Sequence, residues 1–341
     1  MPAQPGLFDD EPLPEPVSEA PAPTRRGARP ADDVLARLDA QHAEARALAA
    51  RLPPHLHFGT SSWSFPGWAG LVYGARRTQS ALARDGLREY AAHPLLTTVG
   101  IDRSYYAPIP LDDFRRYADQ LPDGFRCCIK APASVTAFAL GDRERPVPNP
   151  DFLSPSRLVE ELLAPCAVAF AAHIGPVIIE CPPPPRGLRL EPTAFAERLD
   201  ACLAGLPREF TYAVELRDRA LLTREYAAVL ARHGATHTYN YWSAMPLPGA
   251  QASVVPPAEL TSEALVIRLL LRPGTRYAEQ REAFRPFDTL VEPDEAMRAD
   301  TVSLVQRAAA NQKRIYLLVN NKAEGSSPLT VMALARRLAG A

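Results

Sequence analysis

Two charged side chains stand in an otherwise apolar segment of the chain. The segment reads YAVELRD over residues 212–218, and its composition predicts a strand. Because successive side chains of a strand point to opposite faces, Glu215 and Arg217 share one face. Burying an ion pair costs several kcal/mol for each ion unless its geometry is good. Glu215 and Arg217 therefore indicate either a functional polar site or an ion pair that braces the end of a strand.

Seven further segments resemble this one and indicate the architecture. From residue 55 onward, short runs of β-branched and aromatic residues alternate with segments of helical periodicity. Eight such units within about 285 residues fit a closed (β/α)8 TIM-type barrel. An open doubly wound sheet is the alternative, but no G-x-G-x-x-G motif follows the first predicted strand. The predicted strands are 55–63, 97–106, 125–132, 176–183, 211–218, 236–242, 264–271 and 314–321.

The strands of such a barrel all end at one mouth, and active sites lie there. Alternation along each strand then predicts which polar side chains point inward at this mouth. Three acids and three bases in one ring would be costly in a dry core, so we expect their charges to meet solvent. The predicted ring consists of Ser61, Trp63, Asp102, Lys130, Glu180, Glu215, Arg217, Asn240, Trp242, Arg268 and Asn320.

Five motifs stand in a fixed order along the chain: GTSSWSFPGW at 59–68, VGIDRSYY at 99–106, CIKAP at 128–132, VELR at 214–217 and the pair Asn320–Asn321. Together they resemble the YecE-like family, formally domain of unknown function 72, over nearly all of residues 57–338. The resemblance implies a TIM-type barrel whose biochemical role is not established.

The chain also departs from the family pattern. The family's second-strand glutamate and asparagine are Gly100 and Asp102 here, and a fourth-strand glutamine is Glu180. The histidine of the family after the third strand is Ala137, and the one after the fifth-strand motif is Asp218. The resemblance therefore implies a divergent member of the family.

The residues of the ring favour acid–base chemistry without a cofactor on a small anionic or polyhydroxylated substrate. Lys130 and Glu215 are the first candidates for acid and base, and Asp102 and Glu180 are further catalytic candidates. A salt bridge between Lys130 and Glu180 is an equally good structural interpretation. The candidate substrate-binding residues are Ser61, Trp63, Arg217, Asn240, Trp242, Arg268, Asn320 and Asn321.

A metal site is not favoured. None of the seven histidines forms an H-x-x-x-H or H-E-x-x-H motif. Three acids of the ring could hold Mg²⁺ through oxygen, but the three bases of the same ring oppose a cation. Two alternatives therefore stay open: a metal-assisted phosphodiester hydrolase, and a non-catalytic protein that binds a ligand or a partner.

The loop after the last predicted strand favours anion binding. Gly325, Ser326 and Ser327 precede Pro328, and we expect Ser327 to cap a helix that begins at Pro328. Helix N-termini bind anions, and TIM barrels often hold phosphate after strands seven and eight. We therefore predict that phosphate or sulfate binds near residues 325–329. The long loops 132–155 and 243–263 are predicted lids or partner surfaces.

The first 30 residues are rich in proline and acids, which predicts a disordered tail. Within it, Gln4, Leu7 and Phe8 resemble the short motif by which bacterial DNA-replication and repair proteins bind the sliding clamp. A chance match is the alternative. A helix and lead-in are predicted for residues 31–54, and the barrel for 55–341.

Composition excludes several classes of protein. The 341-residue chain has a formal net charge of -1, so no basic surface field for nucleic acid is expected. No apolar run is long enough for a membrane helix, and the five cysteines show no C-x-x-C spacing. We therefore expect a cytoplasmic protein with reduced cysteines and without direct nucleic-acid or membrane binding.

Overall fold

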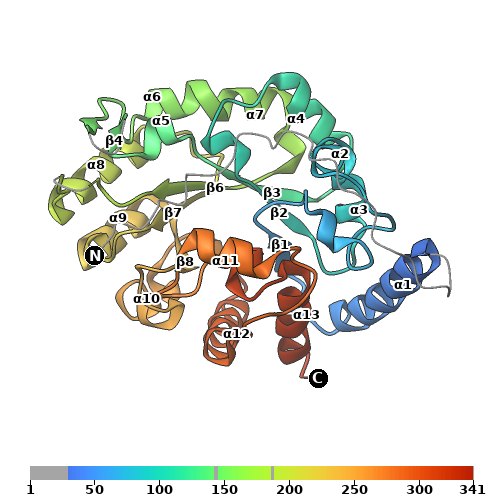
Figure 1. The fold of residues 1–341 in the computed structure, drawn as a ribbon. Coiled ribbons are helices and arrows are strands. Elements are labelled where there is room, and N and C mark those ends of the chain that lie inside the picture. The colour runs from blue at the N-terminus through green and yellow to red at the C-terminus, as the bar shows by residue number, and fades with distance from the viewer. Residues whose placement is uncertain (1–29, 142–144, 186–187, 341) are drawn as a thin grey trace.

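Eight parallel strands form the centre of the protein, and helices surround them (Figure 1). The structure, a computed structural model, describes residues 30–141, 145–185 and 188–340. Each predicted strand is present, and the (β/α)8 architecture is confirmed. The strands are β1 (Leu56–Thr60), β2 (Thr98–Ile101), β3 (Arg126–Lys130), β6 (Ile174–Cys181), β7 (Tyr212–Leu216), β8 (Thr236–Tyr241), β9 (Ala264–Leu269) and β10 (Arg314–Val319).

The strands follow one another around the barrel in chain order, with β10 paired to β1. The seam between β1 and β2 is held by a bridge between Phe58 and Leu96 and by the Thr97 amide, which donates to the Phe58 carbonyl at 2.9 Å. A Cβ at position 59 would lie 2.2 Å from the Thr98 carbonyl oxygen. One at position 100 would lie 2.9 Å from the Ser61 carbonyl oxygen. Glycine at both positions therefore permits the close approach of the backbones at this seam.

The helices cover the outside of the barrel and pack on its strands through one large apolar layer. Their ends follow simple capping rules: Thr223 caps α9 by accepting the Tyr226 amide at 3.2 Å, and Gly234 ends α9 with a positive φ of 68°. The helices are α1 (Pro30–Ala49), α2 (Gln79–Asp85), α3 (Leu87–Ala91), α4 (Leu111–Ala118), α5 (Ala133–Thr136), α6 (Pro155–Leu158), α7 (Ala164–Ala169), α8 (Pro192–Ala204), α9 (Arg224–His233), α10 (Pro248–Val254), α11 (Tyr277–Phe284), α12 (Glu295–Ala310) and α13 (Ser327–Leu338).

The helix predicted within residues 31–54 is α1, which ends at Ala49, ahead of Pro53 and Pro54. It is tied to the last helix by Arg336, which donates to both carboxylate oxygens of Glu44 at 2.6 and 3.0 Å. The predicted tail, with Gln4, Leu7 and Phe8, lies outside the described residues except for Pro30.

Inside the barrel, seven side chains form a second and smaller apolar group. Residues two positions before Lys130, Glu180, Glu215 and Arg268 belong to it, so it lies one layer below the charged residues. It separates the two mouths of the barrel. We call it the interior cluster: Cys128, Ile178, Ala213, Ala264, Val266, Tyr316 and Leu318.

The predicted lid at 243–263 contains α10, which is anchored in the core. Gln251 of α10 is fully buried and donates to the Asn240 carbonyl at 2.6 Å. Its Oε1 lies 3.0 Å from Nε2 of buried His237, whose Nδ1 lies 2.8 Å from the Tyr226 hydroxyl. Because Oε1 can only accept, Nε2 carries the proton and Nδ1 accepts from Tyr226 in the neutral ring. This part of the loop is therefore a fixed support for β8.

We predict that the free energy of unfolding decreases as pH falls from 6.5 to 4. Burial lowers the pKa of His237 to about 4, although the Gln251 bond opposes this. The unfolded chain thus binds a proton that the folded chain excludes, at a cost of about 3 kcal/mol by pH 4. Urea unfolding at pH 7, 6 and 5 measures the slope.

His237→Gln should reduce this slope without abolishing it, because burial also lowers the pKa of His93 to about 3. Exposed His55 provides the control, and His55→Gln should leave the slope unchanged. An unaltered slope in His237→Gln would contradict the assignment.

Candidate functional site

Six charged side chains at the C-terminal ends of the strands form one ion-pair network. We call it the mouth network: Asp102, Lys130, Glu180, Glu215, Arg217 and Arg268. Glu180 is at its centre, because its Oε2 lies 2.9 Å from Lys130 Nζ, 2.7 Å from Arg217 Nη2 and 3.3 Å from Arg268 Nη1. The salt bridge between Lys130 and Glu180 that the sequence suggested is therefore present in the structure.

A second acid completes the centre of the network. Glu215 lies opposite Glu180 in the β6–β7 register, so two carboxylates stand side by side. Arg217 Nη2 is 2.7 Å from Glu215 Oε1, and Arg268 Nη1 is 2.6 Å from Glu215 Oε2. Both guanidinium groups therefore contact both central acids and offset the repulsion between them. Arg268 also reaches Asp102 at 2.7 Å, which joins the third acid.

The expectation that these charges meet solvent is wrong. The Glu180 and Glu215 side chains are 0% exposed, those of Lys130, Arg217 and Arg268 are 1% exposed, and only Asp102 retains 26%. The ions satisfy one another, and aromatic rings lie against two of the cations. The Tyr105 ring centre is 3.9 Å from Lys130 Nζ, and the Trp242 ring centre is 4.3 Å from Arg217 Cζ.

The network holds Glu180 and Arg268 in their charged forms. Burial raises the pKa of Glu180, but Arg217, Lys130 and Arg268 outweigh it and bring this pKa down to about 2. Burial lowers the pKa of Arg268, but Asp102, Glu215 and Glu180 outweigh it and raise this pKa above its ordinary value. Glu180 and Arg268 therefore stay ionised throughout the physiological range.

Several polar atoms around the network have no hydrogen-bond partner in the described part of the chain, although they are buried. Such atoms cost about 1–3 kcal/mol each if nothing satisfies them, so they indicate bound water or a ligand. Both donors and acceptors are among them: Ser61 Oγ, Asp102 Oδ1, Glu180 Oε1, Arg217 Nε and Nη1, and Arg268 Nε.

Not every predicted ring residue contacts the network. Asn240 does contact it: its Nδ2 donates to Glu215 Oε1 at 3.5 Å and to the Leu216 carbonyl at 2.8 Å. Trp63 was predicted to point into the mouth, and this is wrong. Its Nε1 donates to the Leu82 carbonyl at 3.0 Å, and its ring packs edge-on against Tyr117 in the outer apolar layer. Strand β1 ends at Thr60, so the alternation no longer applies at residue 63.

The two asparagines after β10 form hydrogen bonds that stabilise the loop in which they lie. Asn320 Oδ1 accepts the Lys322 amide at 3.0 Å. Asn321 Oδ1 accepts from Trp68 Nε1 at 3.3 Å and from the Ser327 amide at 2.8 Å. These contacts hold the loop that leads into α13.

The start of α13 differs from the prediction. Ser326, not Ser327, is the N-cap residue, and its hydroxyl makes no capping bond. Gly325 has a φ of 117°, and a Cβ there would lie 2.6 Å from the Thr289 carbonyl oxygen. Residues 321–328 are buried, and Asn321 already occupies the Ser327 amide. Anion binding at residues 325–329 remains a prediction.

Two classes of feature are not found in the described ranges 30–141, 145–185 and 188–340. No group of three or more His, Cys, Asp or Glu side chains is arranged to hold a metal ion. No helix there has both the length and the apolar character needed to cross a bilayer.

The comparisons with known proteins agree with the fold. The family model described as Protein of unknown function DUF72 matches residues 57–341. The chain belongs to the DUF72 family. The predicted resemblance to the YecE-like family, which is the same family, is thereby confirmed.

Solved structures of DUF72 family proteins share the barrel. One from Thermotoga maritima is 18% identical, with a TM-score of 0.59 over 83% of this chain and 98% of that one. One from Enterococcus faecalis is 15% identical, with a TM-score of 0.58 over 84% of this chain and 96% of that one. No match was found among curated proteins.

Two residues of the site were missed at the sequence level. Tyr105 covers Lys130 because a short 3₁₀ turn, Arg103–Tyr105, follows β2 where a longer strand was predicted. Gln251 holds the end of β8 from within a loop that was interpreted as a lid. The SYY sequence at 104–106 was a signal for the first, since aromatic residues at a strand end often border a site.

We predict that Glu180→Gln destabilises the protein by about 3–5 kcal/mol, because it leaves three buried cations with one acid fewer. The matched control is Glu259→Gln, which removes an exposed ion pair with Arg224 at 3.4 Å and should cost less than about 1 kcal/mol. Urea unfolding at pH 7 measures both. Equal losses would show that the network contributes no more than a surface pair.

Proposed function

We propose that the mouth network binds a small, uncharged, polyhydroxylated molecule. The main support is the set of buried donors and acceptors on or near Asp102, Glu180, Arg217 and Arg268 that have no partner among residues 30–141, 145–185 and 188–340. A hydroxyl group can donate and accept at once, so a molecule with several hydroxyls can satisfy both kinds of atom. Asp102, the most exposed acid of the network, provides the first contact.

The charge balance favours a neutral ligand over an anion. The network contains three acids and three bases, and each acid has a basic partner within 3 Å. An anion could accept from the remaining N–H groups of Arg217 and Arg268, but it could donate nothing to Asp102 Oδ1 or Glu180 Oε1 and would add a negative charge beside these carboxylates. A neutral polyol leaves the pairs intact.

Aromatic rings offer the second type of contact. Trp242 is half-buried beside Arg217, and Tyr105 is buried beside Lys130. The flat faces of such rings suit the apolar C–H surface of a ring-shaped polyol, while the polar edges of the ligand meet the network.

Binding is better supported than catalysis. Glu180 and Arg268 keep their charges across the physiological range, so neither is suited to exchange protons with a substrate near neutral pH. Lys130 and Glu215 remain the acid–base candidates if the site is an active site. A metal-assisted hydrolase is less favoured, because the three carboxylates already accept from guanidinium or ammonium groups.

Thermal-shift titration with neutral monosaccharides and cyclic polyols tests this proposal. Binding at free ligand concentration L stabilises the folded state by RT ln(1 + L/Kd), so the melting temperature should rise with the logarithm of the ligand excess. Asp102→Asn should weaken binding at least about 10-fold by removing a charged acceptor. Asp112→Asn is the matched control, since exposed Asp112 also pairs with an arginine at 2.7 Å, and it should leave binding unchanged. No shift with any neutral ligand, or equal affinity in Asp102→Asn, would refute the proposal.

A second proposal concerns the N-terminal segment and rests on its sequence. We propose that Gln4, Leu7 and Phe8 dock on a sliding clamp. Leu7 and Phe8 are adjacent large apolar residues in a segment that is otherwise rich in proline and acids. Such a pair can enter an apolar pocket while Gln4 forms hydrogen bonds, which would bring the barrel near DNA without a basic surface.

A fluorescent peptide of residues 1–15 should bind a purified bacterial sliding clamp with an affinity on the order of micromolar. A peptide with Leu7→Ala and Phe8→Ala should lose the signal. A control peptide with Pro12→Ala and Pro14→Ala keeps the motif and should bind equally. A clamp concentration on the order of tens of micromolar would nearly saturate a peptide of micromolar affinity, so absence of binding there would refute this proposal.

A further inference from the structure

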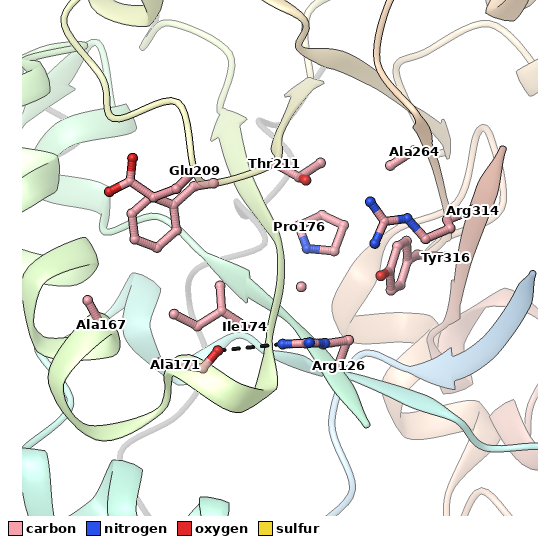
Figure 2. Close-up of a pocket in the computed structure, with 12 residues that line it drawn as sticks. Arg126, Ala167, Ala171, Ile174, Pro176, Glu209, Thr211, Ala264, Arg314 and Tyr316 are labelled. Atoms are coloured by element: carbon pink, nitrogen blue, oxygen red, sulfur yellow. Dashed lines mark hydrogen bonds between the residues drawn. The ribbon is translucent and has the colours of Figure 1, made fainter. Parts of the chain in front are cut away.

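The opposite, N-terminal mouth of the barrel contains a hollow of about 370 Å³ (Figure 2). Its lining comes from the first residues of β3, β6, β9 and β10 and from the segment before β7. In most TIM barrels bulky branched side chains fill the interior. Here the start of β9 contributes only the methyl group of Ala264 to the lining. Gly175, also in the lining, lets β6 approach β3, since a Cβ there would lie 2.8 Å from the Cys127 carbonyl oxygen.

Two arginines and a tyrosine border the hollow. Arg314 and Tyr316 stand two positions apart on β10, and Figure 2 shows both pointing into the space beside Pro176. Arg126 borders it from β3 and is anchored through Nη1, which donates to the Ala172 carbonyl at 2.6 Å. Arg314 has a weaker anchor, a 3.4 Å contact with exposed Glu263.

The tyrosine is a hydrogen-bond donor in this setting. Burial raises the pKa of Tyr316, and the charges of Arg314 and Arg126, which are close enough to act on it, oppose the rise. Its ring stacks on His57 with a centroid distance of 5.2 Å and an interplanar angle of 25°. The hydroxyl is therefore held in place beside two cations.

The rest of the lining is mainly apolar. Ile174, Pro176 and Phe210 form part of the wall, next to the polar groups. Glu209 also lines the hollow, but its side chain extends away from Arg126 and Arg314 in Figure 2. The hollow thus has a basic side and an apolar side.

We propose that this N-terminal hollow is a second binding site, which takes a small organic oxyanion. The carboxylate or phosphate group of the ligand lies between Arg314, Arg126 and the Tyr316 hydroxyl, and its apolar part lies on Ile174, Pro176 and Phe210. Guanidinium groups suit both kinds of oxyanion, because their parallel N–H groups match two oxygens.

The two sites are independent. The interior cluster lies between the hollow and the mouth network, and Ala264 and Tyr316 belong to both the cluster and the lining of the hollow. A ligand at the N-terminal mouth therefore needs no opening of the buried ion pairs. The test of anion binding at the N-terminal mouth is therefore independent of the test of polyol binding at the mouth network.

Calorimetric titration of the full chain with benzoate, phenyl phosphate and benzamide tests the inference. Both anions should bind, and neutral benzamide, which has the shape of benzoate, should bind at least about 10-fold more weakly. The tighter of the two anions identifies the carboxylate or the phosphate ester as the preferred class. Equal binding of benzamide and benzoate, or no binding of either anion, would overturn the proposal.

Variants locate the site. Arg314→Met should weaken anion binding at least about 10-fold, and Tyr316→Phe by a smaller factor. The matched control is Arg224→Met, since Arg224 is also exposed and also lies 3.4 Å from a glutamate. It should bind the anions as the wild type does. Unchanged affinity in Arg314→Met, or an equal loss in Arg224→Met, would refute the assignment.

Discussion

The C-terminal half of the barrel depends on one interaction, the pairing of two side-by-side carboxylates with two guanidinium groups. Glu180 and Glu215 are neighbours in the β6–β7 register, so they repel each other unless cations stand between them. Arg217 and Arg268 contact both acids and thereby link β6, β7 and β9 across the barrel interior. Lys130 adds β3 to the same group. Charges thus take the place of the apolar layer that usually fills this level of a TIM barrel.

The sequence predicts the strands well because the information for them is local. Alternating side chains within each run give the inward face, and Lys130, Glu180, Glu215 and Arg268 lie on it as expected. The same rule still holds at Asp102 and Arg217, each one residue beyond its strand, but it fails at Trp63, three residues beyond the end of β1. Side chains further along a loop depend on the path of the loop, which alternation does not predict.

The sequence also did not reveal that the charged side chains of the mouth network are buried. Six charges near strand ends suggested an open mouth, whereas the structure closes it by mutual pairing and by the rings of Tyr105 and Trp242. Whether a charge is exposed depends on partners from distant strands: Asp102 and Arg268 are 166 positions apart. The hollow at the other mouth is also non-local, since its lining comes from strands that are remote in sequence.

The ion pair between Glu44 of α1 and Arg336 of α13 has a consequence for folding during synthesis. This ion pair cannot form until Arg336 is synthesised, almost 300 residues after Glu44. At a typical rate of about 5–20 residues per second, that interval lasts roughly 15 seconds or more. During it, the surface of α1 that faces α13 is uncovered on the ribosome. Ala45 and Leu48 of α1 are buried in the outer apolar layer of the finished barrel, so in the nascent chain they lack part of that layer until the last elements are made.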